Sequence, residues 1–130
     1  MKKIESYVKS NHDVSFLAED AVFVNMSSGE ETKGRKAIGE MLHYMYHIAF
    51  DATAIVRHIL ENENHAVLEA DFKGKHISDF AGMPATGKQV NMPLCVSYDF
   101  NKEGLISKAR IYMLTDVLIS QLKPEMAGAL

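Results

Sequence analysis

The chain reads Ala66-Val67-Leu68-Glu69-Ala70-Asp71-Phe72-Lys73, and this stretch decides the fold. Its even-numbered residues are all apolar, whereas three of its four odd-numbered residues are charged. A period of two along the chain is typical of a β-strand that buries one face and exposes the other. The pattern continues through Gly74, and its phase places His76 on the buried face.

The same period recurs on the C-terminal side, where residues 90–100 alternate between apolar and polar side chains. Residues 101–104 then form a turn, and residues 105–114 return as a further strand. On the N-terminal side, residues 53–60 read as a strand that a turn at 61–64 joins to the first one. These four consecutive strands predict a meander of long antiparallel strands.

A different spacing occurs in residues 34–49, where apolar residues recur as they do on one face of an amphipathic helix. The residues of this face are Ile38, Met41, Leu42, Met45 and Ile48. We expect a helix of about four turns that packs this face against the sheet.

Shorter elements are predicted at both ends of the chain. Residues 2–9 and 13–19 read as short helices, and residues 21–26 read as the first strand. Residues 116–122 form a last helix that ends before Pro124. Helices followed by a run of strands are typical of an α+β fold rather than of alternating βαβ units.

The composition is that of an ordinary globular protein, with 47% hydrophobic and 24% charged residues. No repeat or linker divides the 130 residues, so we expect a single domain over residues 1–130. The net charge of −3 argues against nucleic acid or an anionic membrane as a partner. The lone Cys95, the lack of an apolar leader and the lack of a long apolar run favour a cytoplasmic protein.

A longer motif lies between the two alternating strands and reads GKHISDFAGMPATGKQV over residues 74–90. It resembles the strand–loop–strand motif of the SnoaL-like family, the polyketide cyclase and ester cyclase branch of the NTF2-like, ketosteroid-isomerase-like superfamily. Three further segments match the family in order and spacing, so that the resemblance covers roughly residues 16–122. They are Glu19–Phe23, Lys33–Ile38, and Tyr112 with Asp116 and Gln121-Leu122.

The resemblance implies a cone-shaped α+β fold, in which a curved antiparallel sheet wraps around N-terminal helices and encloses an apolar pocket. It also implies a cofactor-free enzyme that acts on a small hydrophobic carbonyl compound. The chain departs from the family at Lys75, at Tyr112 in place of tryptophan, and near Cys95 and Val96, where several cyclase-like relatives carry an acid.

Asp116 and His76 are the candidate catalytic residues. Asp116 would be the base, because a carboxylate beside an apolar pocket has a raised pKa that suits proton abstraction next to a carbonyl. His76 would act as an electrophilic or shuttle partner. The alternatives are that Asp116 only caps a helix and that His76 is a buried histidine satisfied by a neighbouring polar group.

Five residues are candidates for ligand binding: Tyr98, Tyr112, Phe72, Met45 and Met92. The tyrosines can line a pocket and present a hydrogen-bond donor, and methionines adapt to flat apolar ligands. His43 and His47 have the i, i+4 spacing of a metal site. They lack the glutamate of H-E-x-x-H and a third ligand, so no metal or other cofactor is expected.

The leading hypothesis is therefore an enzyme that abstracts a proton next to a carbonyl and then cyclises or isomerises its substrate. The alternative is a non-catalytic module that binds a small ligand in the same pocket. A third reading, an epoxide hydrolase, needs an Asp–Arg–Asp set that Arg57, Arg110 and Asp116 only loosely suggest. We also expect a homodimer through the sheet, because residues 105–114 are partly apolar on both faces.

Overall fold

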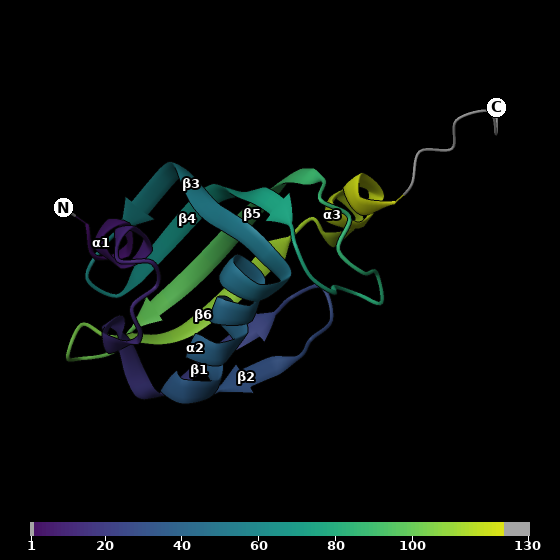
Figure 1. Cartoon of the computed structure of the whole chain (residues 1–130). Helices are drawn as coiled ribbons and strands as arrows, with labels where there is room; N and C mark the ends of the chain where they lie inside the picture. The colour runs from purple at the N-terminus through teal and green to yellow at the C-terminus, as the bar shows by residue number, and fades with distance from the viewer. Residues whose placement is uncertain (1, 124–130) are drawn as a thin grey trace, which may run out of the picture.

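The computed structural model describes residues 2–123, so Pro124, the predicted stop of the last helix, lies outside the described residues. The described part folds into one curved sheet with helices packed against it (Figure 1). The helical elements are α1 (Lys3–Lys9), the 3₁₀ turn η1 (Val14–Phe16), α2 (Arg35–His43), the π-helix η2 (Tyr44–Ala49) and α3 (Thr115–Leu122). The strands are β1 (Leu17–Asn25), β2 (Glu31–Lys33), β3 (Phe50–Glu61), β4 (His65–His76), β5 (Gln89–Phe100) and β6 (Ile106–Met113).

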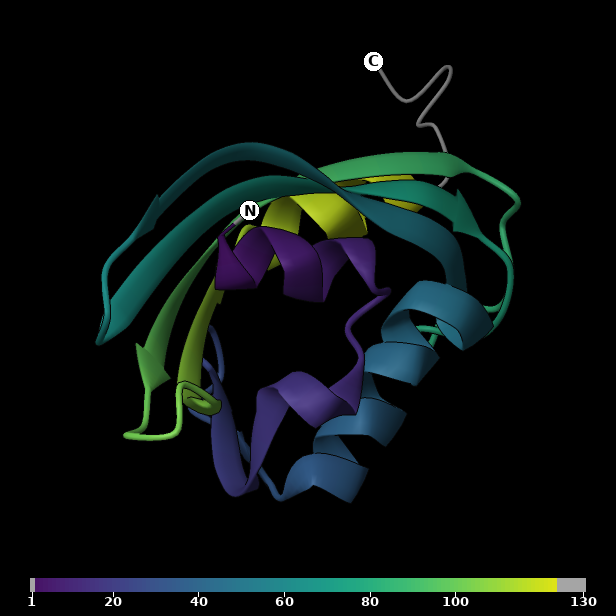
Figure 2. The ribbon, with the colours of Figure 1, turned by 90° about the vertical axis from the view of Figure 1, so that its left-hand side faces the viewer.

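The sheet has the order β2-β1-β6-β5-β4-β3. Strands β3 to β6 form the predicted antiparallel meander, whereas β1 pairs with β6 in parallel, so the sheet is mixed. Figure 2 shows the sheet arching over α1 and α2, which lie on its concave side. The predicted α+β cone is therefore confirmed.

The helix predicted at residues 13–19 is wrong, because only a single 3₁₀ turn forms there before β1 begins at Leu17. The Asp13 carboxylate accepts a hydrogen bond from the Ser15 N–H at 2.9 Å, which caps this turn. Leu17 is already paired with Ile106 of β6 and is fully buried. Burial in the sheet has outweighed the local helical pattern.

The helix predicted at residues 34–49 forms, but its second half is η2, a π-helix. A π-turn holds more residues than an α-turn, so the residues after it rotate around the helix axis. Tyr46 and Ala49 are therefore buried, whereas Ile48, which the helical spacing predicts to face inward, is 45% exposed.

The loop of the motif at residues 74–90 contacts His76, which is fully buried as the strand phase predicts. The Thr86 N–H donates to His76 Nδ1 at 3.2 Å, and the Thr86 hydroxyl oxygen lies 2.9 Å from the same atom. Gly87 has a φ of +69°, in the left-handed region that residues with a Cβ atom rarely adopt. At Gly74, a Cβ would collide with the backbone of Asp51 and Ala52 on β3, so only glycine fits there.

Gln121 of α3 completes the sheet where β6 ends. Strand β6 stops at Met113, opposite Leu94, but β5 extends back to Gln89. The Asn91 N–H donates to Gln121 Oε1 at 2.8 Å, and Gln121 Nε2 donates to the Asn91 carbonyl at 2.9 Å. The side-chain amide thus replaces the missing strand and fixes α3 to the sheet.

Candidate functional site

The cone encloses a cavity of about 80 Å³ between α1, α2, η2 and the concave face of the sheet. Most of its lining is apolar and includes Met41, Met45, Met92 and Met113. Four polar aromatic side chains interrupt this lining: Tyr7, His12, Tyr46 and Tyr98. An apolar pocket with a few converging polar groups is the usual form of a small-molecule site.

The four polar aromatic residues form one connected cluster. The Tyr7 ring centroid lies 5.1 Å from that of His12 and 6.2 Å from that of Tyr98. The His12 ring lies 4.7 Å from the Tyr46 ring. A bound molecule inside the cone would therefore meet several of these side chains at once.

Tyr7 is placed by a contact between α1 and the far edge of the sheet. Both the Lys3 N–H and the Ile4 N–H donate to the Glu61 carboxylate of β3 at 3.0 Å, which caps the helix N-terminus. This contact holds α1 inside the cone and directs the fully buried Tyr7 inward. The Tyr7 hydroxyl has no hydrogen-bond partner among residues 2–123. An unpaired buried hydroxyl is costly, and it is available to a ligand.

The three tyrosines remain protonated in the cavity. Burial, with a smaller contribution from Tyr46, raises the pKa of Tyr7 far above its ordinary value. Burial raises the pKa of Tyr46 to about 12 and that of Tyr98 well above its ordinary value. Each hydroxyl is therefore a neutral hydrogen-bond donor at physiological pH.

His12 enters the cavity from a strained loop. Asn11 and His12 have φ values of +63° and +60°, in the left-handed region that non-glycine residues rarely adopt. Asn11 Nδ2 lies 2.9 Å from His47 Nε2 of η2 and ties the loop to that helix. Burial, with a smaller effect of His47, lowers the pKa of His12 to about 4. The imidazole is therefore neutral at pH 7.

The lowered pKa of His12 predicts that the fold loses stability in mild acid. The unfolded chain binds a proton at His12 near pH 6.5, whereas the folded chain does so only near pH 4, so stability falls as the pH falls between these values. From pH 7 to pH 5 the free energy of unfolding should drop by on the order of 1–2 kcal/mol from this group. Urea titrations should show that this drop shrinks in His12→Gln but not in His58→Gln, which alters an exposed histidine. Equal drops in both variants would contradict the prediction.

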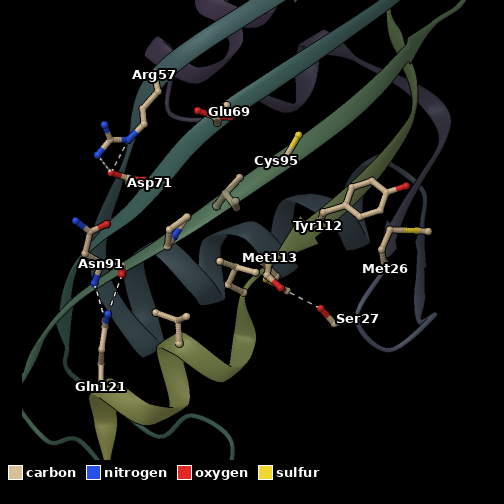
Figure 3. Close-up of a pocket in the computed structure, with 14 residues that line it drawn as sticks. Met26, Ser27, Arg57, Glu69, Asp71, Asn91, Cys95, Tyr112, Met113 and Gln121 are labelled. Atoms are coloured by element: carbon tan, nitrogen blue, oxygen red, sulfur yellow. Dashed lines mark hydrogen bonds and ion pairs between the residues drawn. The ribbon is translucent and has the colours of Figure 1, made fainter.

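A wide groove of about 920 Å³ lies on the opposite, convex face of the sheet (Figure 3). Tyr112, predicted as a ligand-binding residue, is 48% exposed and lines this groove rather than the cavity, because it has the opposite strand phase to Ile111. Arg57 donates to Asp71 at one side of the groove, as the dashed lines in Figure 3 show. Arg110 pairs with Asp99 at 3.0 Å. Both arginines thus pair with carboxylates other than Asp116, contrary to the epoxide hydrolase reading.

The other four predicted ligand-binding residues, Tyr98, Phe72, Met45 and Met92, all line the cavity. His43 and His47 have ring centroids 5.3 Å apart. Among residues 2–123, no group of three or more His, Cys, Asp or Glu residues is placed to hold a metal ion.

The structure does not bring Asp116 and His76 together at the cavity, and neither lines it. Asp116 is exposed on the first turn of α3. Leu118 and Leu122 turn inward, and Asp116 lies roughly 200° around the helix from Leu118. His76 Nδ1 is paired with Thr86 under the loop, whereas the buried His76 Nε2 has no hydrogen-bond partner among residues 2–123, so the alternative of a satisfied buried histidine holds for one ring nitrogen only.

Three residues of the cavity were not predicted from the sequence: Tyr7, His12 and Tyr46. One signal was present, because Asn11 belongs to the few residue types that favour the left-handed region and so marks a sharp turn before His12. The π-turn that directs Tyr46 inward leaves no simple pattern in the sequence. None of the described helices is long and apolar enough to cross a membrane.

A family model, SnoaL-like polyketide cyclase, matches residues 9–114. Among solved structures, the chain is similar to a protein from Jannaschia described as a SnoaL-like polyketide cyclase, with 12% identity, a TM-score of 0.82, and coverage of 95% of this chain and 91% of that one. It is also similar to proteins described as polyketide cyclases from Xanthomonas campestris (21% identity, TM-score 0.79, coverage 93% and 94%) and Pseudomonas putida (17%, 0.80, 93% and 96%). The TM-scores show a shared fold. No curated protein matches the sequence.

Proposed function

The chain belongs to the SnoaL-like polyketide cyclase family, and from this premise we propose that it is a cofactor-free enzyme of the cyclase or isomerase kind. Its substrate would be a small hydrophobic carbonyl compound that binds in the cavity of the cone. The observation that carries the proposal is the unpaired Tyr7 hydroxyl beside a neutral His12 in an apolar enclosure. These are a hydrogen-bond donor and a proton acceptor, the two groups that enolisation of a ketone needs.

The proposed reaction begins with transfer of a proton from the carbon next to the carbonyl to a His12 ring nitrogen. The C–H bond breaks, its electron pair moves toward the carbonyl, and the resulting enolate oxygen accepts a hydrogen bond from Tyr7. In an isomerisation, His12 returns the proton to a different carbon. In a cyclisation, the enolate carbon attacks a second carbonyl, and the new alkoxide takes the proton from His12.

His12 is a weak base, since its pKa is lowered to about 4. Base strength similar to that of a carboxylate is sufficient where the enolate is stabilised by preorganised donors. The cavity is smaller than a substrate ring would need, but methionines repack readily, so the Met41, Met45, Met92 and Met113 side chains can widen it.

Deuterium exchange tests the proposed function. Butyrophenone, an apolar ketone with exchangeable protons beside its carbonyl, would be incubated with the protein in D₂O and followed by proton NMR. We expect exchange that is faster than in buffer, saturates with ketone and is lost when the protein is unfolded. If the ketone binds in the cavity but exchanges its protons no faster than in buffer alone, enzymatic enolisation is contradicted.

The second candidate function is a non-catalytic module that binds the same class of ligand. One observation favours it: no carboxylate lines the cavity within the described part of the chain. The same experiment separates the two functions, because a binding module shifts the NMR signals of cavity residues without exchanging the ketone protons.

We further propose that a second copy of the chain covers the groove on the convex face. Met26, Tyr112, Leu114 and Val117 are exposed around this groove, and α1 and α2 lie on the other side of the sheet. The exposed Tyr112 and Leu114 belong to the lining of the groove, so a two-fold axis would bring the apolar linings of the two copies together. Apolar side chains gathered on one sheet face favour such burial.

Tyr112→Glu should weaken this homodimer by about tenfold or more, because it would bury a charge in the interface. Sedimentation at micromolar concentrations would measure the dissociation constant. Ile48→Glu is the matched control, since Ile48 is equally exposed but lies on η2. A wild-type protein that sediments only as a monomer would remove the proposal.

A further inference from the structure

The sheet side of the cavity changes in character along the cone. Tyr98 lies on β5 close to the turn into β6, whereas Leu94 lies further back on β5, level with Met113 of β6. Between these two levels, Val96 is paired with Ile111. All five side chains line the cavity. Its wall therefore changes from a phenol to branched aliphatic side chains and then to the thioether of Met113.

The polar groups on the helical side of the cavity gather at the Tyr98 end. The Tyr7 ring, whose hydroxyl is unpaired among residues 2–123, lies 6.2 Å from the Tyr98 ring and 5.1 Å from the His12 ring. Burial raises the pKa of Tyr7 and of Tyr98, and the Tyr46 hydroxyl adds to both increases, so it also lies toward this end. A ketone would therefore bind with its carbonyl here and extend its apolar part toward Met113.

Met113 stands at the apolar end of the cavity, where β6 ends. Met113 and Leu94 line both the cavity and the groove on the convex face, so their side chains form part of the wall between the two spaces. The Ser27 hydroxyl donates to the Met113 carbonyl at 3.2 Å, which holds the end of the strand in place (Figure 3). A molecule that extends along the cavity from Tyr7 would therefore end against the Met113 side chain.

We propose that the substrate is a ketone with an unbranched apolar tail, whose carbonyl binds at Tyr7 and whose tail ends against Met113. The Met113 side chain then sets the longest tail that the cavity accepts. The tail must be slender, because the cavity measures about 80 Å³ and the branched side chains of Val96 and Ile111 line its path. This inference rests on the proposed function and adds to it a class of substrate and a residue that determines specificity.

A series of straight-chain methyl ketones, from 2-butanone to 2-undecanone, tests the inference by deuterium exchange. In the wild type, the KM for exchange should fall by about fourfold for each methylene group that the cavity buries, and it should stop falling at one limiting chain length. Met113→Ala removes Cγ, Sδ and Cε from the end of the cavity, so it should move this limit by about three methylene groups. A mere loss of stability would not change the limiting length.

Met26→Ala is the matched control, because it removes the same atoms from a methionine that lines the groove but not the cavity, and it should leave the limit unchanged. Met113→Val shortens the side chain by less and should move the limit by about two methylene groups. This second variant decides the test if circular dichroism shows that Met113→Ala does not fold, since valine suits a strand.

An unmoved limit in the folded Met113 variant, or an equal move in Met26→Ala, overturns this inference. The proposed function then still stands if the short ketones exchange faster than in buffer. If no ketone of the series exchanges faster than in buffer, the proposed function and this inference fail together.

Discussion

Exchange of the butyrophenone α-protons should slow by roughly 100- to 10,000-fold when His12 is replaced with glutamine, the usual loss on removing a general base. Glutamine keeps a polar side chain of similar length but cannot accept a proton near neutral pH. Because the pKa of His12 is lowered to about 4, the wild-type rate should be constant from pH 7 to pH 5 and fall only as the pH approaches 4. Proton NMR in D₂O would measure both the rate and its pH dependence.

Asp116→Asn is the matched control for this prediction. Asp116 is exposed and does not line the cavity, so the exchange rate should stay close to that of the wild type. If Asp116→Asn abolishes exchange while His12→Gln leaves it intact, the assignment of the base to His12 is wrong. The base predicted from the sequence alone would then be the correct one.

The free energy of unfolding should fall by about 3–5 kcal/mol in Phe72→Ala, the usual cost of removing a buried phenylalanine ring. The Phe72 side chain is only 1% exposed. Its ring lies 5.0 Å from the Tyr46 ring and 5.2 Å from the Phe50 ring, so it joins η2 to the sheet. Its loss removes these contacts and leaves a void beside the existing cavity. Urea denaturation monitored by circular dichroism would give the value.

Val67→Ala provides the comparison on the same strand. Val67 is 40% exposed on the convex face, so its truncation should cost about 1 kcal/mol or less. A similar loss in the two variants would mean that the concave face of β4 is not the core of the fold. A smaller loss in Phe72→Ala than in Val67→Ala would reverse the assignment of the faces.

Much of the fold could be predicted because strand phase is a local property. The alternation over residues 66–73 places Phe72 and His76 on the buried face, and both are buried in the structure. The same phase places Tyr98 and Met92 against the cavity. The alternation of apolar and polar residues does not predict the curvature of the sheet or the enclosed pocket. Both were predicted only from the family resemblance.

The candidate site was harder to predict, because it depends on contacts between distant segments. His12 faces the cavity only because two successive residues adopt the left-handed region and the Asn11 amide lies against His47 on η2. Tyr7 does so only because Glu61, far along the chain, caps α1. Asp116 was misplaced because a helix that follows a strand can start at any rotation, and packing of Leu118 and Leu122 decides which one.

The π-helix η2 has a consequence for how the cavity can change during evolution. A π-turn is equivalent to one residue inserted into an α-helix, so deleting one residue from 44–49 would restore regular α-helical geometry. The deletion would turn the preceding side chains by roughly 100° relative to those that follow. Tyr46 and Met45 would then give up their positions in the cavity wall to their neighbours. A single-codon deletion is thus a short mutational route to a cavity with a different lining.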